Sequence, residues 1–299
     1  MYTCWVVGDG ALTARCCDIL LRNDRALRGI VTDSEFVAEW ARERDVATVS
    51  RADMMAELGR ERFDYLLSIV NLRILREDAL ALPEKHAINF HDGPLPEYAG
   101  VHCTSWALLH GATEYGVTWH RISGGVDEGP ILEQERFEVS GRETAYTLNA
   151  KCYDAAARSF ERLDAALASG EAVERAQDLS KRNYFGMFQH PDSVLDFSQS
   201  ASKLEALVRA TELGGHPNLL GRAKVRLGDD YFVCEAAEAV PSVRAWNPGE
   251  VLEADEDGVL VAAGEGALRI TSLSTLDGSP APQLRIGQVF DSLDAEAAR

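Results

Sequence analysis

The sequence predicts an α/β domain built on a mostly parallel sheet, followed by a smaller all-β domain. Three observations predict this fold class. The chain has 299 residues, 46% apolar and 26% charged, which are globular proportions with room for two domains. Its first part alternates short apolar runs with amphipathic helical stretches, as in a parallel sheet covered by helices. Its last part consists of short apolar runs separated by turn residues, which favours a small β-barrel.

The elements of the first part follow from this alternation. Strands are expected over 2–7, 27–32, 64–70 and 87–90, and helices over 11–22 and 35–44. Gly8-Asp9-Gly10 is expected to form the tight turn between the first strand and the first helix. A G-x-G-x-x-G dinucleotide fingerprint is incomplete there, because its third glycine would fall at Thr13. Ligands of such a sheet bind beyond the carboxyl ends of the strands.

The second part begins after a long helix. Thr144 is a suitable N-cap for an Ala-rich helix over 145–168, which Gly170 closes. We expect a first domain over 1–180, a linker over 181–193 and a C-terminal domain over 194–299. That domain is expected to hold a helix over 200–210 and strands over 224–227, 231–236, 249–252, 258–262 and 268–273.

The net charge of the chain disfavours two classes of partner, nucleic acids and anionic membranes. The net charge is −18 and the pI is near 4.8, so the surface repels phosphate backbones and anionic membranes. The densest basic cluster is only Lys181-Arg182, and no apolar run approaches the roughly 20 residues that span a bilayer. We therefore expect a cytoplasmic protein without general nucleic-acid or membrane binding. No Cys-x-x-Cys pair occurs, so the six cysteines are expected to be small buried hydrophobes.

Other catalytic signatures are missing. The sequence contains no Walker loop, no G-x-S-x-G elbow and no H-E-x-x-H motif. A metal hydrolase could draw ligands from His86, His91, Asp92, His102 and Asp127, but their spacing forms no closed ligand pattern. Hydride transfer, ATP hydrolysis and serine or zinc hydrolysis are therefore not indicated.

The informative segment follows the strand at 87–90. Strand alternation places Asn89 and His91 on one face, at the end where a site would open, and a loop with two prolines follows. A second polar cluster, which contains Asp127, comes after another apolar run at 116–121. An amide and a protonated imidazole can stabilise a developing oxyanion, and a carboxylate can orient the imidazole and relay protons. Together they suit acyl transfer to an amine.

These residues carry a resemblance to a known family. Asn-x-His, the Leu95-Pro96 loop ending at Gly100, and Val126-Asp127 with a following glycine resemble the 10-formyltetrahydrofolate-dependent formyltransferases. The resemblance covers the whole chain and implies a Rossmann-like catalytic domain with a C-terminal OB-like barrel. It implies catalytic roles for Asn89, His91 and Asp127, without a metal.

The resemblance also implies a donor site and suggests an acceptor. The pterin of 10-formyltetrahydrofolate should lie against the backbone of Leu72, Ile74 and Leu75 on one loop, and against the backbone of Gly125, Val126 and Asp127 on another. The usual family sequence His-Pro-Ser-Leu-Leu-Pro is replaced here by His-Asp-Gly-Pro-Leu-Pro at 91–96. This form, with Trp119-His120 and Tyr184-Phe185-Gly186, is most similar to formylation domains of nonribosomal peptide synthetases.

The acceptor expected from that similarity is an aminoacyl group on the phosphopantetheine of a carrier protein. The alternative is the amine of an amino-sugar nucleotide. Methionyl-tRNA is disfavoured, because acidic residues outnumber basic ones after residue 193. A catalytically silent folate-binding module is a further alternative, against which the complete set of Asn89, His91 and Asp127 argues.

Overall fold

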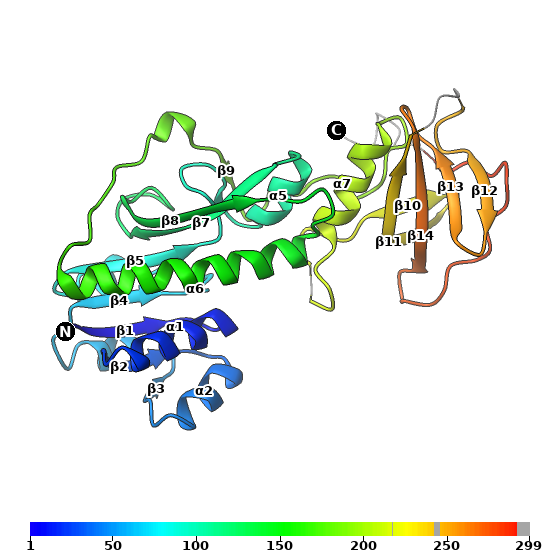
Figure 1. The fold of residues 1–299 in the computed structure, drawn as a ribbon. Helices are drawn as coiled ribbons and strands as arrows, with labels where there is room; N and C mark the ends of the chain where they lie inside the picture. The colour runs from blue at the N-terminus through cyan, green and yellow to red at the C-terminus, as the bar shows by residue number, and fades with distance from the viewer. Residues whose placement is uncertain (217, 242–245, 292–299) are drawn as a thin grey trace. The chain divides into compact units, whose positions relative to one another are not determined.

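The computed structural model describes residues 1–216, 218–241 and 246–291, and Figure 1 shows their fold. Residues 217, 242–245 and 292–299 of the predicted C-terminal domain lie outside the described residues. The chain divides into two compact units. One comprises Met1–Cys103, Glu114–Glu138 and Asn149–Gly186, and the other comprises Thr104–Thr113, Val139–Leu148 and Met187–Arg299.

The first unit is built on a seven-stranded sheet of order β3-β2-β1-β4-β5-β7-β8. Its strands are β1 (Thr3–Val7), β2 (Ala26–Val31), β3 (Thr48–Val49), β4 (Tyr65–Ser68), β5 (His86–His91), β7 (Glu114–Arg121) and β8 (Ile131–Glu138). The pairs from β3 to β5 are parallel, whereas β5–β7 and β7–β8 are antiparallel. The strand order reverses between β1 and β4, which is where a sheet of this kind opens a crevice for ligands.

Helices accompany this sheet, and the sequence predicts three of them, over 11–22, 35–44 and 145–168. The helices of the first part of the chain are α1 (Ala11–Arg22), α2 (Glu35–Arg42), α3 (Met54–Leu58), α4 (Glu77–Leu80), α5 (Cys103–Leu109) and α6 (Ala145–Ser169). All residues of α5 after Cys103 belong to the second unit. The indole of Trp119 in β7 donates to Ser159 Oγ of α6 at 3.0 Å and its ring packs on Phe160. Tyr2, directly before β1, donates to the fully buried carboxylate of Asp164, also in α6.

The predicted elements of this unit are largely confirmed. The helix α1 has the predicted bounds, and each of the four expected strands is present with ends shifted by at most a few residues. The short elements β3, α3 and α4 were not predicted, because so few residues carry no measurable period. All six cysteines are buried and free, as expected.

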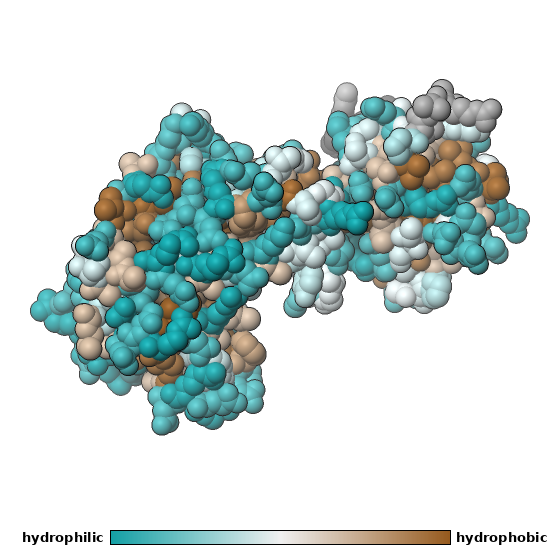
Figure 2. Space-filling model, viewed as in Figure 1, coloured by the Kyte–Doolittle hydropathy of each residue, from teal (hydrophilic) through white to brown (hydrophobic). Residues whose placement is uncertain are grey.

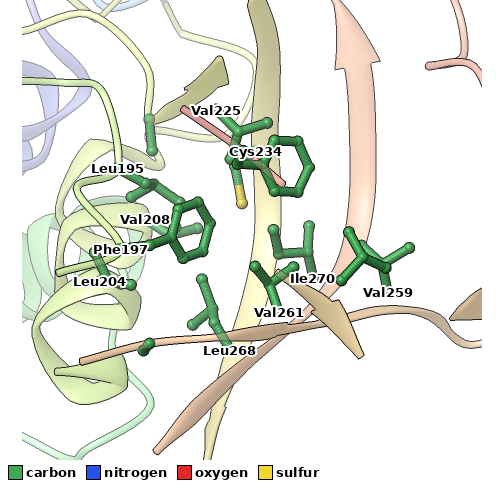
Figure 3. Close-up of a cluster of buried hydrophobic side chains, with 14 of the residues drawn as sticks. Leu195, Phe197, Leu204, Val208, Val225, Cys234, Val259, Val261, Leu268 and Ile270 are labelled. Atoms are coloured by element: carbon green, nitrogen blue, oxygen red, sulfur yellow. The ribbon is translucent and has the colours of Figure 1, made fainter. Parts of the chain in front are cut away.

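The second unit holds an antiparallel sheet of order β10-β11-β14-β13-β12. Its elements are α7 (Ala201–Thr211), β10 (Lys224–Leu227), β11 (Asp230–Val240), β12 (Val251–Asp255), β13 (Gly258–Ala262) and β14 (Ala267–Thr275). Figure 3 shows the apolar cluster between α7 and this sheet, in which Phe197, Val261 and Leu268 are fully buried. The predicted order of an α/β domain followed by an all-β domain is confirmed.

The expected linker contains structure of its own. Within residues 181–193, β9 (Tyr184–Phe185) pairs in parallel with β6 (Ala99–Gly100), and a 3₁₀ turn at Leu179–Lys181 precedes it. Asn183 Oδ1 also accepts a hydrogen bond from the backbone of Tyr98. This segment therefore braces the loop that follows β5.

The visible surface is mostly hydrophilic (Figure 2), as expected for a net charge of −18. Within the described ranges, no helix combines the length and the apolar character that crossing a membrane requires.

Candidate active site

Three neighbouring strands place a row of polar side chains on one face of the first unit's sheet. Ser68 of β4 is the register partner of Asn89 in β5, and Asn89 is the register partner of His120 in β7. Register partners point to the same face of a sheet, so the three side chains lie side by side. Ser68 and His120 are buried, and their polar atoms therefore need partners within the protein.

Hydrogen bonds link this row. Ser68 Oγ donates to Asn89 Oδ1 at 2.8 Å, and Asn89 Nδ2 lies 3.3 Å from His120 Nε2. The other ring nitrogen of His120, Nδ1, lies 3.1 Å from the carbonyl oxygen of Arg121. A carbonyl only accepts, so Nδ1 carries a hydrogen and Nε2 can accept from Asn89 in the neutral ring. One N–H of Asn89 is thereby engaged and the second is left for a substrate oxygen.

His91 and Asp127 meet beside this row. His91 follows Asn89 by two residues on the same face, and its Nδ1 lies 3.5 Å from Asp127 Oδ2. Its Nε2 lies 2.7 Å from the carbonyl oxygen of Tyr98, so Nε2 carries a hydrogen. A proton on Nδ1 would then form an ion pair with the carboxylate, while the 3.5 Å spacing leaves that N–H able to reach a substrate oxygen.

Asp127 lies between two imidazoles. Its Oδ1 is 3.4 Å from His120 Nε2, and its Oδ2 accepts from the backbone N–H of Gly100 at 2.9 Å. Burial alone raises the pKa of Asp127, but the charge of His91, the polar contact with His120 and the Gly100 N–H together hold that pKa well below its ordinary value. Asp127 is therefore an ionised carboxylate in a nearly dry site.

The loop after β5 gives the site its rigid wall. Gly100 has a φ of +103°, and a Cβ there would lie 2.1 Å from the carbonyl oxygen of Phe185 in β9. A side chain at this position is thus excluded by both backbone conformation and space. Tyr98 presents its carbonyl to His91 while its ring stacks on Phe185. The β6–β9 pairing therefore holds the backbone groups that contact His91 and Asp127.

The residues predicted for the donor lie on two loops. Leu72 and Ile74, in the loop after β4, are 82% and 84% exposed, while Leu75 packs partly into the core below that loop. Gly125 and Val126 are exposed in the loop between β7 and β8, directly before the buried Asp127. Leu72 and Ile74 thus present apolar surface on the loop where the donor is expected.

The ligand set considered for a metal hydrolase is not brought together. Within the described residues, the group of three metal-type ligands with atoms inside 4.8 Å is His91, Asp92 and Cys103. His86 instead faces Glu174, 3.6 Å away. In the group itself, His91 Nε2 is committed to a backbone carbonyl, and burial raises the pKa of the Cys103 thiol well above its ordinary value.

Two site residues were not predicted. His120 belongs to a segment that the sequence singles out, but its alignment with Asn89 depends on antiparallel pairing. Ser68 ends an apolar strand and carries no motif at all. Period-two alternation could have placed both side chains on a sheet face, but not on the face and row of Asn89.

The fold and this cluster define an α/β protein suited to group transfer through an amide, an imidazole and a carboxylate. Two family models match the chain: formyl transferase over residues 26–162, and formyl transferase, C-terminal domain, over residues 188–286. The chain belongs to the formyl transferase family.

Solved structures share the fold. An N-formyltransferase from Helicobacter canadensis, in complex with folinic acid and dTDP-3-aminofucose, has a TM-score of 0.73 and 16% identity, covering 91% of this chain and 99% of that chain. HypX from Aquifex aeolicus, in complex with tetrahydrofolic acid, has a TM-score of 0.66 and 16% identity. The match covers 91% of this chain and 44% of the HypX chain. A 4-N formyltransferase from Francisella tularensis has a TM-score of 0.62 and 16% identity, and the match covers 73% of this chain and 90% of that chain.

Proposed function

We propose that this protein transfers a formyl group from 10-formyltetrahydrofolate to a primary amine. The observation that carries the proposal is the contact between the buried His91 and Asp127, beside which His120 links Asp127 to the partly exposed Asn89. Membership of the formyl transferase family supports it. The folate compounds in the Helicobacter canadensis and Aquifex aeolicus structures support the choice of donor.

The cluster supplies the groups that this transfer needs. A bond forms between the amine nitrogen and the formyl carbon, the bond from that carbon to N10 of the folate breaks, and a proton passes from the amine to N10. The free N–H of Asn89 and the Nδ1–H of His91 stabilise the negative charge that develops on the formyl oxygen. Asp127 orients His91 and carries the proton.

The loop after β4 suits the donor. Leu72 and Ile74 offer exposed apolar side chains, against which the flat face of a pterin can be buried. The backbone of Gly125 and Val126 is exposed beside Asp127, which would bring the second donor loop next to the catalytic carboxylate. No step in this scheme requires a metal.

An amino-sugar nucleotide is the acceptor that we propose. The Helicobacter canadensis neighbour binds dTDP-3-aminofucose, and another neighbour, WlaRD, is a sugar 3N-formyltransferase. These relatives favour the alternative of the sequence analysis over its main expectation, an aminoacyl group on a carrier protein. The comparisons provide no support for a carrier protein as partner. The net charge of −18 still disfavours methionyl-tRNA.

The test is a competition among acceptors. Purified protein with 10-formyltetrahydrofolate is offered an amino-sugar nucleotide, a carrier-loaded amino acid, the free amino acid and methionyl-tRNA, and formyl addition is followed by mass spectrometry. We expect the highest kcat/KM for the amino-sugar nucleotide. A preference for the carrier-loaded substrate would overturn the proposed acceptor, and absence of formylation on all four would overturn the proposed function.

A cytoplasmic location of the protein stays a prediction.

A further inference from the structure

A one-directional chain of hydrogen bonds reaches Asn89 from outside the predicted catalytic set. Arg51 Nη1 donates to Asn71 Oδ1 at 2.9 Å, and Asn71 Nδ2 donates to Ser68 Oγ at 3.3 Å. Ser68 Oγ donates to Asn89 Oδ1 at 2.8 Å, and Asn89 Nδ2 faces His120 Nε2 at 3.3 Å. We propose that Ser68 and Asn71 are positioning residues that hold Asn89 with its Nδ2, and not its Oδ1, toward the reacting carbonyl; this rests on the proposed function.

The direction of the chain is imposed at its start. A guanidinium can only donate, so the oxygen of Asn71 must face Arg51 and its nitrogen must face away. The backbone of Arg73 imposes the same orientation, because its N–H donates to Asn71 Oδ1 at 3.3 Å and its carbonyl accepts from Nδ2 at 3.0 Å. Three groups of fixed polarity therefore agree on one orientation of the Asn71 amide.

The direction then passes through Ser68. Because Asn71 Nδ2 donates to the hydroxyl oxygen, the single hydrogen of Ser68 is free to donate onward to Asn89 Oδ1. This turns the nitrogen of Asn89 toward His120 and the site. The reverse orientation would place the Asn89 carbonyl oxygen beside a developing negative charge, where it repels instead of stabilising.

The far end of the chain agrees. At the far end, His120 Nδ1 lies 3.1 Å from the Arg121 carbonyl oxygen and carries a hydrogen, so a ring with that one hydrogen presents Nε2 as an acceptor to Asn89 Nδ2. At the near end, Arg51 is 10% exposed and is held by the carboxylates of Asp9 and Asp33. The chain is thus anchored at its Arg51 end by a group that can only donate.

The test uses Ser68→Ala, which removes the middle link without changing charge. We expect kcat and the single-turnover rate constant to fall about 10- to 100-fold, with the KM for both substrates unchanged. One oxyanion donor contributes a factor of about 10²–10³ to the rate, and this variant misorients the donor without removing it. Ser68→Thr restores the hydroxyl and should recover most of kcat. The matched control is Ser159→Ala, a buried serine on α6 that binds Trp119 and should keep wild-type kcat.

A second measurement does not depend on turnover. The Asn89 side-chain amide is observed by ¹⁵N NMR, assigned by its loss in Asn89→Ala, and it should shift and exchange faster in Ser68→Ala and in Asn71→Asp. A wild-type kcat or an unchanged amide signal in Ser68→Ala would overturn the proposal. If the wild-type protein formylates no amine, the proposed function fails, while the amide signal still decides whether this chain orients Asn89.

Discussion

Nδ1 of His91 lies 3.5 Å from Oδ2 of Asp127, and both side chains are less than a tenth exposed. In such a site the Coulomb attraction between a positive charge on the imidazole and the carboxylate is weakly screened, and it lowers the pKa of Asp127. In the proposed function, His91 lies beside the reacting oxygen and Asp127 beside the proton to be moved. The predictions below follow from this arrangement and from the contacts that hold it.

Asp127→Asn should keep the fold and lose most of the activity. An amide can neither accept the proton nor hold an imidazolium, so we expect formyl transfer to fall about 10²- to 10⁴-fold, the contribution of a positioned acid–base group. Single-turnover formylation, measured together with thermal melting, checks this. A variant with a wild-type rate would remove Asp127 from the mechanism.

His91→Ala and Asn89→Ala should each reduce the rate by about 10²–10³. Because both groups act on the same developing oxyanion, the double variant should lose less than the product of the two single effects. A double-mutant cycle on single-turnover rates measures this coupling. Strictly multiplicative effects would show that the two residues act on separate steps.

The stability of the protein should depend on Asp127 at acid pH. Its folded-state pKa is held below the unfolded value of 3.8, so the carboxylate favours folding above about pH 4 and this contribution is lost as the pH falls further. Urea unfolding of the wild type and of Asp127→Asn is compared at pH 7 and pH 3. We expect a smaller loss of unfolding free energy for Asp127→Asn, and equal losses would contradict the shifted pKa.

Asp164→Asn should destabilise the first unit without changing its chemistry. The carboxylate is fully buried and accepts from Tyr2 at 2.6 Å and twice from Arg25, so removing its charge leaves Arg25 without its ion pair. Breaking a buried ion pair costs about 3–5 kcal/mol. The matched control is Asp154→Asn, whose exposed bond to Arg15 contributes about 0–1 kcal/mol. Equal costs in urea unfolding would show that burial is not the deciding factor.

Gly100→Ala should impair both stability and catalysis. The added Cβ meets the Phe185 carbonyl oxygen, so the backbone that donates to Asp127 and supports His91 must move. The control is Gly111→Ala, which also has a positive φ but open space around it, and should cost about 1–2 kcal/mol from conformation alone. Formylation rates and melting temperatures separate the two. A Gly100→Ala enzyme with normal kcat would show that this backbone does not position the site.

Much of the site could be predicted because its motif residues are close in sequence. Asn89 and His91 lie on one strand at a spacing of two, so alternation alone places them on one face. Asp127 was predicted from the resemblance of Val126-Asp127 to a family motif. Its contact with His91 further requires the positive φ of 57° at Asp127 and the loop that Gly100 ends, and neither follows from residue type.

The sequence by itself determined the main strands and helices and the two-part organisation, and it singled out Asn89, His91 and Asp127 as candidates, because periodicity, turn residues and a local motif are properties of neighbouring residues. Only the tertiary structure decided that Ser68 and His120 flank Asn89. Which residues of two strands become opposite depends on backbone hydrogen bonds between segments 21 and 31 residues apart, and a shift of one residue would turn either side chain to the other face. For that reason the orientation of the Asn89 amide is a property of the folded sheet.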